Sequence, residues 1–206
     1  MKKAGWILVS MLSFSIGLYP ITYFLIDRKF GLLNSKSVEL LMYIPWNIGF
    51  YAHIIFGGIA LLVGWTQFNQ SLRNSYLTLH RTIGKIYVFS VFISAMAGIY
   101  IAFFATGGIV PSIGFLGLGI TWFATTYLAY QNIRNRRLAA HQKWMTYSYA
   151  ACFAAVTLRI WLPMLTAITH DFIISYKIVA WLCWVPNIVV AYFLTKRYEK
   201  VQAALP

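Results

Sequence analysis

The sequence predicts an all-α polytopic membrane protein with six transmembrane helices, in which helices two to five form a central four-helix bundle flanked by helices one and six. Three observations predict this fold. The 206 residues are 60% hydrophobic and 10% charged, whereas about a quarter of a soluble domain is charged. The mean hydropathy is +0.68. Six apolar runs are each long enough to cross a bilayer as a helix.

The six runs account for most of the chain, so we expect a single integral membrane domain over residues 1–206. They extend over about 5–26, 47–67, 82–105, 109–130, 143–167 and 175–195. The first run follows Lys2 and Lys3 as in a signal peptide, but it is about 20 residues long and no small-x-small cleavage site closes it. We therefore expect a membrane helix there. In the last run, Pro186 beside Asn187 predicts a local bend.

Basic residues alternate between the two sides of the membrane in a pattern that predicts orientation. Twelve fall on one side: Lys2, Lys3, Arg73, Arg81, Lys85, Arg134, Arg136, Arg137, Lys143, Lys196, Arg197 and Lys200. Four fall on the other: Arg28, Lys29, Lys36 and Lys177. Because cytoplasmic loops are rich in Lys and Arg, we expect both termini in the cytoplasm. The net charge of +13 then reflects topology and contact with the lipid bilayer, not nucleic-acid binding.

Several kinds of chemistry lack the residues that they need. No CxxC, P-loop, GxGxxG, HExxH or GxSxG pattern occurs. The four acidic residues lie in or near loops, which argues against a carboxylate relay or metal cage within the membrane: Asp27, Glu39, Asp171 and Glu199. Ser148 and Cys152 are too far along the helix from His141 to form a nucleophile and base pair. The sequence leaves open whether the protein is an enzyme.

Two ionisable residues lie on one face of the fifth run. His141 and Arg159 are 18 residues apart, which is five turns and roughly 27 Å along a helix. Between them the same face carries Met145, Ser148, Cys152 and Ala155. A face of small and polar side chains is expected to pack against protein, not lipid.

His80 and His141 begin their helices at the cytoplasmic edge. Two imidazoles from different helices at one depth are what the iron of a b-type haem requires as axial ligands. We expect Arg73, Arg81 and Lys143 near the haem propionates, as charge-assisted partners. The competing interpretation is that an interfacial histidine beside basic residues is solvated or faces lipid.

Two of the histidines precede a glycine by one turn, His53 before Gly57 and His80 before Gly84. Such a glycine gives room either for a porphyrin plane or for the close approach of another helix, and both interpretations stay open. His53 and His170 form a weaker outer pair. An interhelical hydrogen bond accounts for His53 equally well.

Arg159 is the most unusual residue of the spans. An arginine within a membrane helix is costly by several kcal/mol unless it pairs or reaches the interface, and no carboxylate lies at its depth. It either snorkels to the outer interface or forms part of a polar or anion-binding site at the outer end of the bundle.

These residues also carry a family likeness. The stretches HIIFGGIALLVGWTQF, LHRTIGKIYVFSVFISAMAGIYIAF and HQKWMTYSYAACFAAVTLR resemble the predicted bacterial membrane proteins grouped as domain of unknown function 2306, over about residues 50–160. The resemblance implies that the family's motif positions are His53, Gln67, Arg73, His80, Arg81, Gly84, His141, Trp144 and Arg159. In one departure, Tyr147 stands where the family often has an arginine. The family name implies no activity.

We expect a redox protein of a bacterial inner membrane that holds haem b through His80 and His141, with His53 and Arg159 forming a second site on the outer side. It would exchange electrons with quinol or another membrane partner. Six helices with histidines at the membrane edge are similar in architecture to diheme b-type cytochromes, by analogy only. The alternative is a transporter, or a lipid-binding or small-anion-binding membrane protein, without any cofactor. Its expected ligand contacts are His53, Arg159, Arg73, Gln67 and Trp144. Helices interrupted at mid-membrane favour transport.

Overall fold

The computed structural model describes residues 3–26 and 29–203, and every regular element in this part of the chain is helical. The elements, in which η marks a 3-10 turn, are α1 (Lys3–Leu18), η1 (Tyr19–Ile21), α2 (Thr22–Leu25), η2 (Gly31–Ser35), α3 (Val38–Met42), α4 (Ile44–Gly64), η3 (Trp65–Phe68), α5 (Gln70–Ser75), α6 (Leu77–Ala102), α7 (Ile109–Arg134), α8 (Leu138–Cys152), α9 (Ala154–Thr169), α10 (Phe172–Leu182) and α11 (Val185–Ala203). Six stretches of the described chain have the length and hydropathy of a membrane span: Ala4–Leu25, Ile44–Phe68, Leu77–Ala102, Ile109–Arg134, Leu138–Thr169 and Phe172–Arg197. The predicted all-α fold with six spans is confirmed.

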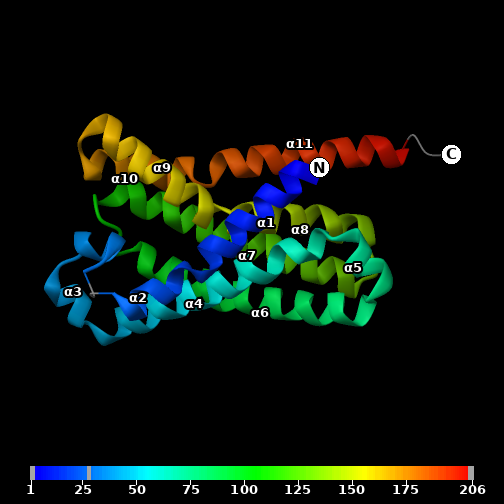
Figure 1. Ribbon diagram of the computed structural model, residues 1–206, viewed down its shortest axis with the longest axis horizontal. Coiled ribbons are helices and arrows are strands. Elements are labelled where there is room, and N and C mark those ends of the chain that lie inside the picture. Colours follow the sequence, from blue (N-terminus) through cyan, green and yellow to red (C-terminus); the bar gives the residue numbers. More distant parts are fainter. Residues whose placement is uncertain (1–2, 27–28, 204–206) are drawn as a thin grey trace.

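The helices run along the long axis of the molecule (Figure 1). In the central bundle α6 packs between α4 and α7, and α7 packs between α6 and α8. The first span packs on α4, and α11 packs on α8, so the first and last spans flank the bundle. The buried centre of the bundle includes Tyr87, Val91 and Val156, all with 0% exposure.

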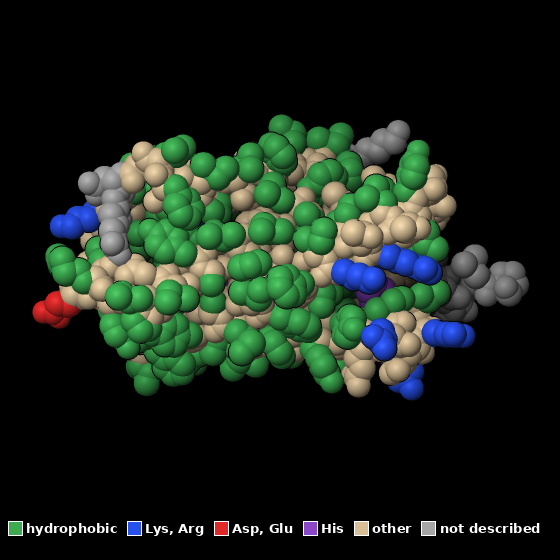
Figure 2. All heavy atoms as spheres, turned by 90° about the horizontal axis from the view of Figure 1, so that it is seen from below, with side chains coloured by type: hydrophobic (Ala, Val, Ile, Leu, Met, Phe, Trp, Pro, Cys, Tyr) green, Lys and Arg blue, Asp and Glu red, His purple; other side chains and the backbone are tan. Residues whose placement is uncertain are grey.

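The two ends of the molecule differ in charge. Hydrophobic side chains cover the middle of the face in Figure 2, and Lys and Arg gather toward the end where α5 lies. We call this the basic end; the opposite end, with η2, α3 and the turn from α9 to α10, is the loop end. Among side chains that the structure describes, the basic end has Arg73, Arg81, Lys85, Arg134, Arg136, Arg137, Lys143, Lys196 and Arg197, and the loop end has Lys29, Lys36 and Lys177. The asymmetry matches the predicted loop pattern, from which the cytoplasmic placement of the termini remains a prediction.

A network of buried hydroxyl groups ties three spans together at the centre of the bundle. The hydroxyl groups of Tyr87 and Ser148 are 2.8 Å apart, and Ser148 Oγ is 2.6 Å from Thr126 Oγ1. Next to this network a Cβ at Gly64 would lie 2.6 Å from Cε2 of Tyr149 and 2.7 Å from Cε2 of Tyr87. Only a glycine therefore lets α4 approach the two tyrosine rings this closely.

The fifth and sixth spans are each interrupted near their middle. The sixth divides at Cys183 and Trp184, directly before Pro186, as the predicted bend requires. The fifth divides at Phe153, between α8 and α9, although it was expected to be continuous. No proline lies near Phe153, so the interruption there needs another cause.

Asn187 supplies that cause, because its amide bridges the two interruptions. The amide Nδ2 donates to the carbonyl oxygen of Ala150 at 3.3 Å and to that of Cys183 at 2.9 Å. In an uninterrupted helix the Ala150 carbonyl would accept from the fourth residue on, so a side chain here competes with the backbone ladder. Thr157 Oγ1 also donates to the Cys183 carbonyl. The carbonyl groups freed in the apolar interior are thus satisfied by side chains.

Replacing Asn187 by leucine keeps the volume but removes these hydrogen bonds. We expect Asn187→Leu to lower the free energy of unfolding by about 1 kcal/mol, the scale of interhelical hydrogen bonds in membranes, and by more if the carbonyls stay unpaired. Thermal unfolding in detergent measures the change. Asn132→Leu is the matched control, because the Asn132 amide bonds only to Leu128 in its own helix. Equal stability of the two variants would contradict the bridging role.

Candidate functional site

The bundle encloses a cavity of about 210 Å³ in the half of the molecule toward the loop end. Its walls come from α1, η1, α2, η2, α4, α6, α7, α8, α9 and α10, and most of the lining is apolar. The ionisable side chains on its wall are Tyr23, Lys36, His53, Cys152, Arg159 and Tyr176. An apolar cavity of about 150 Å³ is already large enough to bind benzene, so this one has room for a ring or a short chain segment.

Arg159 extends from α9 into this cavity wall. Its Nη1 donates to the carbonyl oxygen of Ala155 at 2.8 Å, and its Cζ lies 4.3 Å from the centre of the Tyr19 ring. Its Nε is buried and has no hydrogen-bond partner. Within the described part of the chain no carboxylate contacts it. Of the two interpretations left open by the sequence, the structure matches the polar site, because the guanidinium lies against Tyr19 inside the fold.

His53 lies on α4 across the cavity from this arginine and within range of its charge. The Nδ1 atom of His53 is 2.9 Å from the carbonyl oxygen of Ser94, so Nδ1 carries the hydrogen. Ser94 Oγ returns a hydrogen bond to the carbonyl oxygen of His53 at 2.8 Å. The interhelical role of His53 is therefore confirmed. In the neutral ring, Nε2 is left as an acceptor for a ligand.

Lys36 belongs to the loop segment after η2 and lines the cavity near its loop end. Its Nζ donates to the carbonyl oxygen of Phe104. Ser35 Oγ lies 3.0 Å from Thr106 Oγ1, so the η2 segment is fastened across the end of α6. Burial lowers the pKa of the Lys36 amine to about 8, because an apolar surrounding disfavours the charged form.

The remaining predicted site residues lie at the basic end, away from the cavity. His80 Nδ1 is buried without a hydrogen-bond partner, and the charges of Arg73, Arg81 and His141 act on this ring. His141 Nδ1 donates to the carbonyl oxygen of Ala129 at 2.9 Å. The structure thus brings His80 and His141 into one neighbourhood, as expected.

Trp144 does not line the cavity and instead packs against neighbouring aromatic and core residues. Its ring centre lies 5.7 Å from that of Tyr147, and the indole packs against the central core. Tyr147 itself accepts a hydrogen bond from Thr195 Oγ1 at 3.5 Å. His170 ends α9 in a left-handed conformation with φ 53° and does not line the cavity.

Side chains of neighbouring helices lie against the two glycines that could make room either for a porphyrin or for another helix. A Cβ at Gly84 would lie 3.0 Å from Oε1 of Gln67, and a Cβ at Gly57 would lie 3.0 Å from Oγ of Ser94. Close packing is the interpretation that matches Gly84, where Gln67 reaches the glycine from η3, whereas Gly57 also lines the cavity. Within residues 3–26 and 29–203, no three His, Cys, Asp or Glu side chains cluster as metal ligands. Beside His80, the Gln67 side chain lies against Gly84, in space that a porphyrin on this histidine would need.

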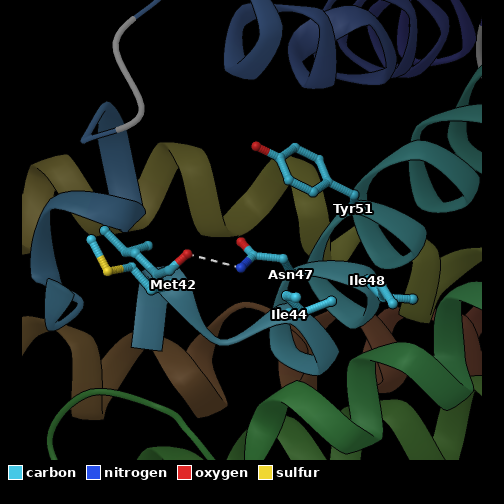
Figure 3. Close-up of a pocket in the computed structure, with 6 residues that line it drawn as sticks. Met42, Ile44, Asn47, Ile48 and Tyr51 are labelled. Carbon is cyan, nitrogen blue, oxygen red and sulfur yellow. Dashed lines mark hydrogen bonds between the residues drawn. The ribbon is translucent and has the colours of Figure 1, made fainter. Parts of the chain in front are cut away.

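A second hollow lies on the outside of the fold, where α3 turns into α4 (Figure 3). Its lining is Leu41, Met42, Ile44, Asn47, Ile48 and Tyr51. The Asn47 amide donates back to the carbonyl oxygen of Leu41 at 2.8 Å. No charged side chain among the described residues lines this hollow, and its exposed apolar residues suit contact with lipid chains.

Several residues of the site were not singled out from the sequence. Tyr23, Lys36 and Tyr176 line the cavity, and Tyr19 and Ser94 contact its Arg159 and His53. Aromatic residues in a first span are indistinguishable from interfacial anchors when only the sequence is considered. Lys36 was counted only as a charge that sets topology. Its place on the cavity depends on how the η2 segment folds back over α6, which no local pattern reports.

These features define a polytopic helical membrane protein whose bundle contains an apolar cavity with two basic side chains, Lys36 and Arg159, on its wall. The chain belongs to a family described as predicted membrane protein, DUF2306, whose model matches residues 50–195. The match includes His53, Arg159 and the basic-end residues from Arg73 to Lys143, whereas Tyr19, Tyr23 and Lys36 precede it and Lys196 and Arg197 follow it. No curated protein and no solved structure matches the chain.

The low pKa of Lys36 predicts a specific pH dependence of stability. The unfolded chain holds its proton up to a pKa of about 10.4 and the folded protein only to about 8. The unfolded state therefore binds more protons between these values, and stability rises with pH there. After allowance for partial solvent screening, we expect the wild type to gain about 1–2 kcal/mol relative to Lys36→Met between about pH 8 and pH 10.

Chemical denaturation in detergent across this pH range gives the comparison. Lys36→Arg is the second variant, because it keeps the positive charge but does not titrate in the range. A wild-type pH profile parallel to those of both variants would contradict the burial of this amine.

Proposed function

We propose that the protein binds an anionic amphiphile from the bilayer, with the negative group at Arg159 and the apolar body in the cavity. The observation that carries this proposal is a guanidinium on the wall of an apolar cavity, with one N–H group buried and unpaired and, among residues 3–26 and 29–203, no carboxylate in contact. Leaving such a group unpaired is costly. An anionic ligand group offsets that cost by charge-assisted hydrogen bonds.

The lining of the cavity favours an amphiphile over a small inorganic anion. Apart from the few polar groups, the wall consists of aliphatic and aromatic side chains, among them Trp46, Phe50, Phe115 and Trp122. Pockets for organic ligands have this composition, with a few polar groups that orient the ligand. His53 Nε2 and Lys36 add an acceptor and a second positive charge to the polar set.

A short fatty acid, whose chain fits a cavity of this size, is a suitable probe, with its methyl ester as the uncharged control ligand. We expect Arg159→Met to weaken fatty-acid binding roughly 10- to 100-fold, the equivalent of one charge-assisted hydrogen bond of about 1.5–3 kcal/mol, and to leave ester binding unchanged. Arg159→Lys should lose less, because it keeps the charge. Quenching of tryptophan fluorescence reports binding, since Trp46 and Trp122 line the cavity.

Arg134→Met is the control variant. Arg134 also lies over a tyrosine ring, at 5.9 Å from the centre of Tyr130, but it is exposed at the basic end. The Arg134→Met variant should bind the fatty acid as the wild type does. The proposal fails if Arg159→Met and the wild type bind the acid equally well.

Transport of the same amphiphile is a second candidate, favoured by the interruptions at Phe153 and at Cys183 and Trp184. Substrate sites in many transporters lie beside helices interrupted at mid-membrane. Here Cys152 and Ala154, on either side of the first interruption, line the cavity. A fluorescent fatty acid should then cross proteoliposome membranes faster with the wild type than with Arg159→Met. Equal rates with intact binding would limit the protein to binding.

Electron transfer through haem b, the function first expected, draws less support from the geometry. His80 and His141 share a neighbourhood, but Gln67 occupies the space beside Gly84 that a porphyrin would need. We therefore do not propose that a haem or a quinone binds at this end. Sharp cytochrome bands in the visible spectrum of the reduced protein would contradict this interpretation.

A further inference from the structure

Two buried polar atoms at the basic end have no hydrogen-bond partner, Nε2 of Gln67 and Nδ1 of His80. Gln67 lies in η3 and His80 in the first turn of α6. Gly84 brings them together, because the Gln67 carboxamide lies over this glycine and His80 is one turn before it on the same face of α6. The two unpaired atoms therefore belong to one small polar site.

An unpaired buried polar group costs about 1–3 kcal/mol, and such groups are rare in native proteins. Two of them next to the same turns of α6 point to a partner supplied from outside the chain. The Gln67 amide nitrogen can only donate a hydrogen bond, so its partner must contain an acceptor atom. This requirement restricts the ligand to one that presents oxygen to the site.

The charges around the site favour a negative ligand. Arg73 is half-buried in the last turn of α5, and the charges of Arg73 and Arg81 both act on His80. The acidic residues with described side chains, Glu39 and Asp171, are both at the loop end. The face in Figure 2 shows histidine surface between Lys and Arg side chains at this end.

We propose that Gln67, His80 and Arg73 form a second binding site, separate from the cavity, for a phosphate group. Gln67 Nε2 and His80 Nδ1 each donate a hydrogen bond to a phosphate oxygen, and Arg73 contributes the positive charge. Phosphate presents several acceptor oxygens and carries negative charge, which matches two donors beside arginines. The site lies at the start of a span, where phospholipid headgroups are found, so the phosphate belongs either to a lipid or to a free ion.

The test uses the full-length protein in nanodiscs of phosphatidylcholine, with phosphatidylglycerol added to one set and inorganic phosphate to another. We expect saturable stabilisation against heat, weakened at least tenfold in apparent affinity by Arg73→Gln and by Gln67→Met. Arg73→Gln changes a partly exposed residue and so guards against a variant that fails to fold. Gln142→Met, an exposed glutamine at the same end, is the control.

Stabilisation by phosphatidylglycerol alone identifies a lipid headgroup, and stabilisation by inorganic phosphate identifies the free ion. The proposal is overturned if neither ligand stabilises the wild type, or if both variants respond as the wild type does. Arg73→Gln and Gln67→Met separate this site from the cavity, because neither residue lines the cavity and an anionic lipid bound at Arg159 would not respond to either change. Failure of fatty-acid binding at Arg159 therefore has no bearing on this result.

Discussion

The arrangement depends on one constraint, that backbone carbonyl groups within the hydrocarbon layer must find hydrogen-bond donors. Asn187 and Thr157 meet this constraint where the fifth and sixth spans are interrupted. The interruption allows α8 to pack in the central bundle while α9 packs against α1 and α10. Arg159 lies on the part of the span after the interruption, and its guanidinium consequently reaches Tyr19 and the cavity.

The cavity combines two features that are separately unfavourable for folding. It leaves space inside a packed interior, and it places the charges of Arg159 and Lys36 next to apolar walls. A fold selected for stability alone would fill the space and neutralise the charges. Sites that bind ligands are where such costs are retained, because the ligand supplies the missing contacts.

Much of the fold was predictable because membrane spans follow from length and hydropathy alone. The bend before Asn187 also followed from a local cause, Pro186. The buried face of the fifth run was predicted correctly too, since Met145, Ser148 and Cys152 are all buried. The interruption at Phe153 was not predictable, because its cause is a side chain 34 residues away along the chain.

The candidate site was predictable only in part, for the same reason. His53 and Arg159 stood out because charged and titratable groups are rare in spans. The sequence did not show which side chain packs against each glycine, because Gln67 and Ser94 reach Gly84 and Gly57 from other helices. Histidine and glycine at helical spacing suggested a haem. In the structure, polar side chains from other segments lie in the space beside these glycines. Spacing within one helix does not reveal which neighbour occupies the space beside it.

The most direct test of the account is a high-resolution electron cryomicroscopy map of the protein purified in native membrane lipid, without added ligand. The account predicts elongated density in the cavity between α4, α6 and α9, with its polar end within hydrogen-bond distance of the Arg159 guanidinium. A cavity without such density, together with an Arg159 side chain turned away from Tyr19 toward the membrane surface, would contradict it.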